Sequence, residues 1–307
     1  MIAFICPGQG SQSVGMGQEI YDEYPIAREL LDRLDEAVDF ALLEMMFGGP
    51  AEELTATENA QPALLAASLA VATVLDGDGI EAELAAGHSL GEYSALAVAG
   101  VIGPEDAMRL VRVRGRLMAE AGAEMGGVMA AVIGLSDDEL ERAVKGVDNG
   151  LVTIANFNSD GQTVISGERE GVAAASRKAS ELGAKHVIPI QVSGAFHCEL
   201  MKPAAEKLAA VLEQLDFADA GIPVVTNVDA TAQKDAGSLK ESLVRQLTEP
   251  VLWKQSIAEM VAAGVDTFVE VGSGAVLSKM LKRSGVKARV LSTGNAADVA
   301  EVIRELT

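Results

Sequence analysis

The chain has 307 residues, of which 49% are hydrophobic and 4% aromatic, and its formal net charge is −21 at pH 7. This acidity argues against nucleic acid and an anionic membrane surface as partners, because both need a basic face. Cys6 and Cys198 form neither a CxxC pair nor a disulfide framework, so we expect a reducing, cytoplasmic compartment. The N-terminus lacks the basic segment of a signal peptide, and the longest apolar run, Ala63–Leu75, is too short to span a bilayer.

The first third of the chain alternates between strand and helix patterns. In chain order we expect a buried strand at Ile2–Cys6, helical patterns at about 17–47 and 60–75, a strand at Glu83–Ala86, and helices at Tyr93–Ala99 and Pro104–Ala121. Such alternation favours a parallel sheet with helices on both faces.

A composition break at Gly122–Gly127 opens a segment with a different order of elements. We expect strands at Val128–Ile133, Val152–Asn156, Thr163–Ser166 and His186–Ile190, with helices at Asp137–Val144 and Arg169–Leu182. A β-α-β-β-α-β order is the ferredoxin-like pattern. We therefore predict a small subdomain at residues 125–191, inserted into a large α/β subdomain made of residues 1–124 and 192–307.

After Gly194 the original alternation resumes. We expect a helix at Glu199–Leu215, a strand at Val224–Asn227, helices at Leu239–Leu247 and Trp253–Ala263, a strand at Thr267–Val271, a helix at Ala275–Arg283 and a strand at Val290–Ser292. The chain contains no internal repeat and no low-complexity tract.

Ser89 is the first candidate for chemistry. It lies in Gly87-His88-Ser89-Leu90-Gly91, a GxSxG pattern between a predicted strand and a predicted helix. A sharp turn there exposes the serine hydroxyl, and the N–H group of Leu90 is placed to stabilise an oxyanion. The competing interpretation is a chance match in a glycine-rich protein.

A serine nucleophile needs a base, and the chain has only three histidines, at positions 88, 186 and 197. His88 is the direct neighbour of Ser89, and adjacent side chains diverge on a sharp turn. His186 opens a strand of the small subdomain. His197 lies in a loop before a helix, whose N-terminus keeps an imidazole neutral, so His197 is the preferred base.

Arg114 interrupts an apolar helix stripe. Ala107, Leu110, Val111, Leu117 and Met118 follow helical spacing, and position 114 completes their face. A guanidinium on an inward face needs an anion. That anion is either a structural carboxylate or the carboxylate of a substrate, and the sequence barely separates the two.

Two glycine-containing loops are the remaining candidates for cofactor chemistry. The loop Pro7–Gln12 follows the first strand, and its N–H groups, including that of Gln9, are candidates to complete an oxyanion hole. Neither this loop nor Gly272-Ser273-Gly274 fits GxGxxG, because Ser13 and Leu277 stand where glycine is needed. The histidines lack ligand spacing, so no metal is expected. Cys198 adjoins His197 but is discounted as a nucleophile.

Together these motifs resemble the malonyl-CoA:acyl carrier protein transacylase family. The resemblance covers essentially the whole chain and is carried by Pro7–Gln12, Gln61-Pro62-Ala63, Gly87–Tyr93, Arg114-Gly115, Asn156–Ser159, Gly194–His197, and Gln246 ahead of Pro250–Trp253. The sequence departs from the family only at Cys198, where serine is usual.

The resemblance implies a role for each matching residue. Ser89 is the nucleophile and His197 the base, and the backbone carbonyl of Gln246 holds the other imidazole nitrogen. The N–H groups of Gln9 and Leu90 form the oxyanion hole, and Arg114 binds the malonyl carboxylate. It further implies a hydrolase-like large subdomain with a ferredoxin-like small one.

The resemblance also implies the substrates and partners. His88 and Phe196 belong to the substrate pocket, and a phenylalanine before the catalytic histidine favours malonyl over methylmalonyl. Malonyl-CoA and acyl carrier protein are the expected partners, no cofactor is needed because the coenzyme A thioester is a substrate, and we expect a monomer. Carrier docking requires a basic patch, for which the candidates are Lys185, Lys279, Lys282 and Arg283.

Three alternatives stay open. A serine esterase or thioesterase of the α/β-hydrolase type fits the GxSxG turn, but it requires an acidic third member and leaves Arg114 unexplained. A docking module with a vestigial site is disfavoured by intact Ser89, His197 and Arg114. The sequence does not separate fatty acid from polyketide synthesis.

Overall fold

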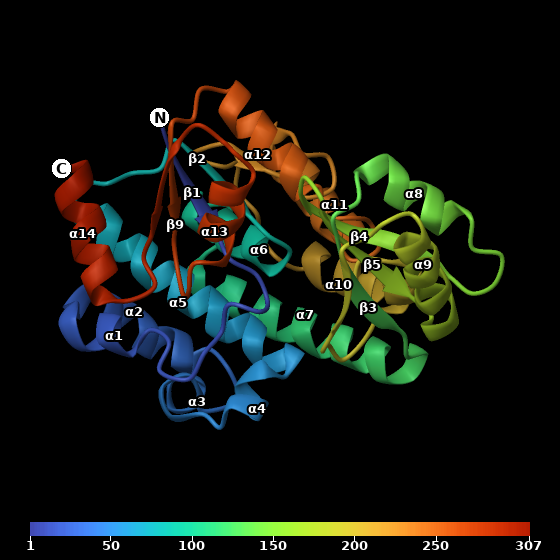
Figure 1. The fold of residues 1–307 in the computed structure, drawn as a ribbon. Helices are drawn as coiled ribbons and strands as arrows, with labels where there is room; N and C mark the ends of the chain where they lie inside the picture. Colours follow the sequence, from blue (N-terminus) through green and yellow to red (C-terminus); the bar gives the residue numbers. More distant parts are fainter.

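The computed structural model describes all of residues 1–307, and two sheets organise it (Figure 1). The larger sheet has the order β10-β9-β1-β2-β7-β8. Neighbouring strands are parallel except for the β7–β8 pair. Its strands are β1 (Ile2–Cys6), β2 (Leu84–Gly87), β7 (Val224–Val225), β8 (Ala232–Gln233), β9 (Thr267–Glu270) and β10 (Arg289–Ser292).

Both faces of the larger sheet are apolar, because alternate residues of each strand enter different cores. Phe4 and Cys6 of β1 join the main core with helices α2 (Pro25–Glu36), α5 (Thr57–Gly77), α6 (Leu90–Val98) and α7 (Pro104–Met125). Ala3 and Ile5 point to the other face, against helices α12 (Trp253–Ala262) and α13 (Val276–Arg283). This is the predicted α/β layering.

Helix α5 is long and apolar enough to cross a membrane by length and composition alone. In the fold, 83% of its most apolar window is buried. The helix packs against α2, α6 and α7 in the main core (Figure 1). Its apolar surface is thus covered by protein.

The smaller sheet has the order β4-β5-β3-β6, and all neighbouring strands are antiparallel. Its elements are β3 (Val128–Ile133), α8 (Asp137–Lys145), β4 (Val152–Ser159), β5 (Gln162–Gly167), α9 (Arg169–Glu181) and β6 (His186–Ile190). Helices α8 and α9 share a separate core with this sheet. The order of strands and helices is ferredoxin-like, which confirms the predicted fold class.

All four strands of the smaller sheet fall inside the predicted 125–191 insertion, while the boundaries themselves stay a prediction. Strand β4 reaches the large sheet's helices: the N–H group of Phe157 donates to the carbonyl of Val251, and Asn156 bridges to Val251 just before α12. This contact brings β4 next to the carboxyl edge of the larger sheet.

Several elements differ from the sequence-based expectation. The pattern at 17–47 is three helices, α1 (Gln18–Glu23), α2 and α3 (Leu42–Gly48), and the expected helix at 199–215 is a short 3-10 turn (Glu199–Met201) followed by α10 (Lys202–Glu213). Helix α11 (Ala236–Gln246) begins earlier than predicted. The elements that were not predicted are α4 (Ala51–Thr55), β8 and α14 (Ala296–Leu306).

The difference that matters for chemistry concerns α6. The prediction began this helix at Tyr93, whereas it begins at Leu90, directly after Ser89. Gly91 lowers helix propensity but is needed for close packing, so tertiary contacts override the local preference. Ser89 therefore stands immediately before the N-terminal turn of α6.

Candidate active site

Ser89 occupies a strained turn between β2 and α6. Its φ is 52° and its ψ is −106°, a conformation that L residues rarely adopt. Neighbouring glycines permit the turn, because a Cβ at Gly87 would lie 1.9 Å from the backbone of Gly91 and a Cβ at Gly91 would lie 2.0 Å from the carbonyl oxygen of Cys6. The turn presents the hydroxyl at the carboxyl edge of the sheet, as in a nucleophile elbow.

His197 lies beside this hydroxyl. Its Nε2 is 2.8 Å from Ser89 Oγ, and its Nδ1 is 2.7 Å from the backbone carbonyl oxygen of Gln246. A carbonyl only accepts, so Nδ1 carries the proton and Nε2 is free to accept one from the serine. Burial, followed by the nearby Arg114 charge, lowers the pKa of His197 to about 3. The imidazole is therefore neutral and suited to act as a base.

Two backbone N–H groups beside Ser89 have no acceptor inside the protein. They belong to Gln9, in the loop after β1, and to Leu90, the first residue of α6. Both residues line a cavity of about 320 Å³ that also contains Ser89 and His197. Unused donors in the same cavity as a nucleophile are the groups that an oxyanion needs.

Arg114 extends from α7 into the same cavity and is 1% exposed. Its guanidinium donates to Gln61 Oε1 at 2.7 Å, to Gln246 Oε1 at 2.9 Å and to Ser89 Oγ at 3.1 Å, and it lies 5.0 Å from the centre of the Tyr93 ring. These partners are all neutral, and Arg114 Nε has no acceptor. Burial lowers the pKa of the guanidinium.

The contacts of Arg114 decide between the two interpretations offered by the sequence. A structural salt bridge requires a carboxylate on the guanidinium, and no Asp or Glu forms an ion pair with Arg114. A buried cation with neutral partners retains the capacity to bind an incoming anion. The arrangement therefore favours a substrate carboxylate.

His88 and Phe196 also line the cavity. His88 Nε2 is 2.8 Å from Asn158 Oδ1, its ring packs edge-on against Trp253, and burial lowers its pKa. Phe196 is 5% exposed and forms part of the apolar wall. The structure thus brings the predicted pocket residues together around Ser89.

Cys198 is buried outside this cavity. Its thiol donates to the backbone carbonyl of Ala195 at 3.2 Å, and burial raises its pKa. A raised pKa disfavours the thiolate, which is the reactive form. These contacts support the choice of Ser89 over Cys198 as nucleophile.

The cationic candidates for carrier docking lie in two places: three on α13 and one before β6. Lys279, Lys282 and Arg283 are exposed on α13 without an ion-pair partner, and Gly274, just before α13, lies against Ser11 of the β1 loop. Lys185 lies before β6 in the smaller sheet and packs against Gly134.

Two polar residues at the site were not singled out from the sequence. Asn227 follows β7, and its Oδ1 accepts from the N–H group of Ser89 at 2.7 Å. Glu92 is fully buried on α6, and burial raises its pKa to about 7. The available signals were a polar residue at the end of an apolar strand for Asn227, and the Ser89-x-x-Glu92 spacing for Glu92.

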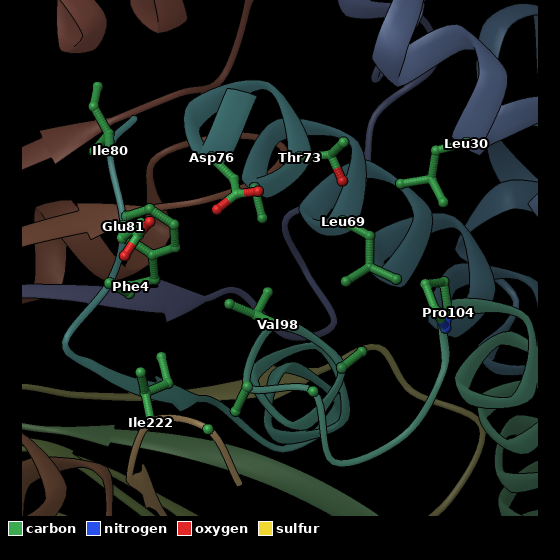
Figure 2. Close-up of a pocket in the computed structure, with 16 residues that line it drawn as sticks. Phe4, Leu30, Leu69, Thr73, Asp76, Ile80, Glu81, Val98, Pro104 and Ile222 are labelled. Atoms are coloured by element: carbon green, nitrogen blue, oxygen red, sulfur yellow. The ribbon is translucent and has the colours of Figure 1, made fainter. Parts of the chain in front are cut away.

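A second cavity, of about 370 Å³, lies at the amino ends of the strands of the larger sheet, beside the segments that lead into β2 and β7 (Figure 2). Its walls are mainly apolar, and Asp76 and Glu81 supply its carboxylates. It contains no histidine, cysteine or serine. The smaller cavity at Ser89 is therefore the candidate active site, although it is not the larger of the two.

Comparison with known proteins gives the family of the chain. The acyl transferase domain family model matches residues 3–307. The malonyl CoA-acyl carrier protein transacylase of Bacillus subtilis is 46% identical over 307 residues, covering 99% of this chain and 97% of that protein. The Escherichia coli K12 protein of the same name is 46% identical over 283 residues, covering 92% of each chain.

Solved structures show the same likeness. A malonyl-transacylase in complex with a type II PKS acyl-carrier protein superposes with a TM-score of 0.96 at 40% identity, covering 99% of both chains. An acyl carrier protein S-malonyltransferase from Vibrio cholerae gives 0.94 at 40% identity, covering 98% of this chain and 99% of that one. The fold and sequence thus define an acyltransferase. Within that class, this chain belongs to the malonyl-CoA:acyl carrier protein transacylase family, as the sequence motifs predicted.

Proposed function

We propose that this protein transfers the malonyl group of malonyl-CoA to the phosphopantetheine thiol of an acyl carrier protein through a malonyl ester on Ser89. The observation that carries the proposal is the guanidinium of Arg114, which is buried, lacks a carboxylate partner and lies 3.1 Å from Ser89 Oγ. An acyl group attached to Ser89 and ending in a carboxylate places its charge within reach of that guanidinium. The names of the relatives support the same substrate and carrier.

In the first half-reaction Ser89 Oγ attacks the thioester carbonyl, and its proton passes to His197 Nε2. The N–H groups of Gln9 and Leu90 stabilise the oxyanion, and the Gln246 carbonyl holds the imidazolium through Nδ1–H. Collapse of the intermediate breaks the carbon–sulfur bond. Coenzyme A leaves as its thiol after taking the proton from His197.

In the second half-reaction the carrier thiol attacks the malonyl ester, and its proton passes to His197 Nε2. Collapse now breaks the ester bond, and the proton returns to Ser89 Oγ. Two sequential displacements at one serine predict ping-pong kinetics. Arg114 holds the malonyl carboxylate in both halves.

The esterase alternative receives less support from the geometry. It requires an acidic third member, whereas the group facing His197 Nδ1 is the backbone carbonyl of Gln246. It also does not explain why the buried guanidinium of Arg114 has only neutral hydrogen-bond partners. We propose fatty acid synthesis as the pathway served. The relative in complex with a type II PKS acyl-carrier protein makes the equivalent polyketide role the second candidate.

We further propose that the protein acts in the cytoplasm as a monomer, without nucleic acid or membrane partners. The net charge of −21 supports the absence of nucleic acid and membrane partners, because it repels both kinds of polyanionic surface.

The proposed function predicts a covalent malonyl adduct on Ser89. Mixing the protein with malonyl-CoA and digesting it for mass spectrometry should place one malonyl group on the peptide that contains Ser89. The Ser89→Ala variant should give no adduct, because the other candidate nucleophile, Cys198, is buried outside the cavity with its thiol bonded to the Ala195 carbonyl. A wild-type protein that stays unlabelled, or full activity with the label on Cys198, would contradict the proposal.

A further inference from the structure

Ser89 and Glu92 have the spacing of a helix capping box, yet the structure forms neither of its two bonds. In a capping box the serine hydroxyl accepts from the N–H group of the third helical residue, whose Glu carboxylate accepts from the serine N–H. Ser89 is the residue before α6 and Glu92 is the third residue of that helix, but Ser89 makes no side-chain cap bond. Its hydroxyl is instead 2.8 Å from His197.

Asn227 replaces the missing capping interaction. Its Oδ1 accepts from the N–H group of Ser89 at 2.7 Å, and its Nδ2 donates to the carbonyl oxygen of Gly87 at 2.6 Å. The side chain therefore bonds both arms of the turn around Ser89. It is fully buried, so water does not compete for these bonds.

Glu92 in turn holds Asn227. Its Oε2 accepts from the backbone N–H group of Asn227 at 3.1 Å and from Gln246 Nε2 at 2.7 Å. Gln246 Nε2 also donates to the carbonyl oxygen of Ser89 at 3.0 Å. The carboxylate that would close a capping box is thus bound to residues of two other segments.

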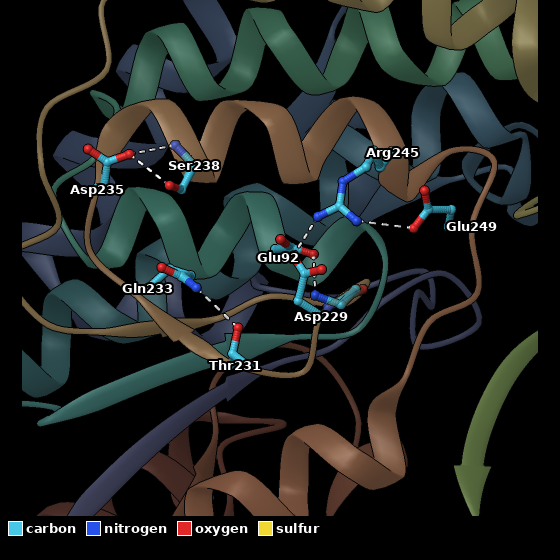
Figure 3. A network of polar contacts seen from close by, with 9 residues as sticks. Glu92, Asp229, Thr231, Gln233, Asp235, Ser238, Arg245 and Glu249 are labelled. Carbon is cyan, nitrogen blue, oxygen red and sulfur yellow. Dashed lines mark hydrogen bonds and ion pairs between the residues drawn. The ribbon is translucent and has the colours of Figure 1, made fainter.

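The segment that carries Asn227 is itself tied to α11. Figure 3 shows Glu92 beside Asp229, which pairs with Arg245 at the end of α11, while Arg245 also pairs with Glu249. These ion pairs anchor the chain two residues beyond Asn227. These contacts hold the backbone near Asn227 in place, and so they fix the position of its side-chain amide beside Ser89.

We propose that Asn227 is a positioning residue that prevents Ser89 and Glu92 from forming an ordinary capping box and so keeps the Ser89 hydroxyl directed at His197. Without the Asn227 amide, the N–H group of Ser89 is left unpaired in a buried site, and the nearest carboxylate able to accept it is Glu92. Ser89 then relaxes from its positive φ, and its hydroxyl turns toward the helix N–H groups. This inference rests on the proposed function only in taking Ser89 as the residue that is acylated.

The test is the rate and the final extent of malonyl-Ser89 formation in Asn227→Ala. Because the nucleophile is misaligned, we expect the single-turnover rate with malonyl-CoA to fall about 100-fold. We expect the same fall with acetyl-CoA, because Arg114 keeps its contacts with Gln61 and Gln246. The final extent should still reach one malonyl group per chain, since the protein remains folded. A partly unfolded population would give the opposite pattern, a reduced extent at an unchanged rate.

The matched control is Thr226→Val, one residue away. The Thr226 hydroxyl is buried without a hydrogen-bond partner and touches no residue of the turn around Ser89 by hydrogen bonding. Its removal should leave the rate within about twofold. An Asn227→Ala protein that is acylated at the wild-type rate overturns the inference and leaves the proposed function intact. An unlabelled wild-type protein overturns the proposed function instead.

Asn227→Asp provides a second test if the alanine variant fails to fold. A protonated Asp has the same donor and acceptor as Asn, whereas an ionised Asp loses the donor to Gly87. The charged groups around this position are Glu92 on α6, Arg114 on α7, and the Asp229–Arg245 pair. The ratio of the variant's acylation rate to that of the wild type should fall as the pH rises from 5 to 8. A ratio that stays constant overturns the inference.

Discussion

At the scale of single residues, the Ser89 hydroxyl lies between a base and a cation. His197 Nε2 is 2.8 Å away on one side, and the Arg114 guanidinium is 3.1 Å away on the other. The base directs the hydroxyl toward attack, and the cation selects an acyl group with a negative end. Reactivity and specificity at this serine therefore depend on different neighbours and can be separated by mutation.

Arg114→Ala should reduce malonyl transfer about 100-fold more than acetyl transfer, because a buried charge-assisted contact to the carboxylate is lost only for malonyl. The measurement is kcat/KM for malonyl-CoA and acetyl-CoA. Arg116→Ala is the control, since Arg116 lies on the exposed face of α7 and pairs with Asp39. Equal losses for both substrates would show that Arg114 is structural.

The lowered pKa of His197 predicts a flat pH profile for acylation. The base works only when unprotonated, and with a pKa of about 3 it is unprotonated at every pH from 5 to 8. An ordinary histidine would lose most of its basic form at pH 5. Single-turnover acylation with malonyl-CoA measured across this range checks the point. Glu92 also titrates in this range, because burial raises its pKa to about 7. A rate that halves near pH 6.5 in both the wild type and Glu92→Gln would mean that the His197 imidazole is solvated in the working enzyme.

At the scale of elements, the contact between α6 and β1 determines where Ser89 stands. The helix can begin directly behind Ser89 only because Gly91 lets it approach the backbone of Cys6. The same approach brings the N–H group of Leu90 and the loop containing Gln9 to one cavity. A glycine that reduces helix propensity is therefore required by packing.

Gly91→Ala should destabilise the protein by about 2 kcal/mol, because the new Cβ would lie 2.0 Å from the carbonyl oxygen of Cys6 and one element must move. Denaturant unfolding measures the change. Gly48→Ala is the control, since a Cβ there meets nothing within 4 Å. An unchanged midpoint for Gly91→Ala would show that α6 shifts freely, which the strained turn at Ser89 does not allow.

At the scale of the whole molecule, the net charge opposes docking of an acidic carrier. The exposed and unpaired cations of α13, Lys279, Lys282 and Arg283, form a local cluster of positive charge. The loop before α13 contacts the β1 loop at the site. We propose this α13 patch as the docking surface. Lys185 belongs to the other sheet, and nothing in its contacts joins it to the patch.

The α13 patch predicts salt sensitivity of the carrier half-reaction alone. Raising the ionic strength from 0.05 to about 0.5 M shortens the screening length well below 10 Å, so KM for the carrier protein should rise severalfold. Transfer to free pantetheine is the control and should change little. Lys282→Glu should raise the carrier KM at low salt. A KM for the carrier protein that does not change with salt would contradict docking on the α13 patch.

The sequence by itself determined the α/β class, the ferredoxin-like order of the small sheet, and the candidates Ser89, His197 and Arg114. These follow from local information: hydrophobic periods of 2 or 3.6 residues, a GxSxG turn, the presence of only three histidines, and an arginine on an apolar helix stripe. The family motifs added Gln9 and Gln246. No comparable local signal marked α4 or β8, which are only five and two residues long. Helix α14 has such a signal, an Asn295 cap followed by buried Ala296, Val299 and Val302 at helical spacing, and the prediction missed it. It also missed the start of α6, which the Ser89-x-x-Glu92 spacing indicates.

Only the tertiary structure decided that Arg114 has no carboxylate as an ion-pair partner and what keeps Ser89 out of a capping box. It also showed the contact of His197 with the Gln246 carbonyl, which the family resemblance implied. Each answer depends on contacts between residues far apart in the chain, such as Asn227 with Ser89 and Gln246 with His197. From the sequence, Ser89-x-x-Glu92 alone indicates a helix cap. In the fold, Asn227 binds the Ser89 N–H group and Glu92 binds Asn227, which leaves the hydroxyl free to face a base.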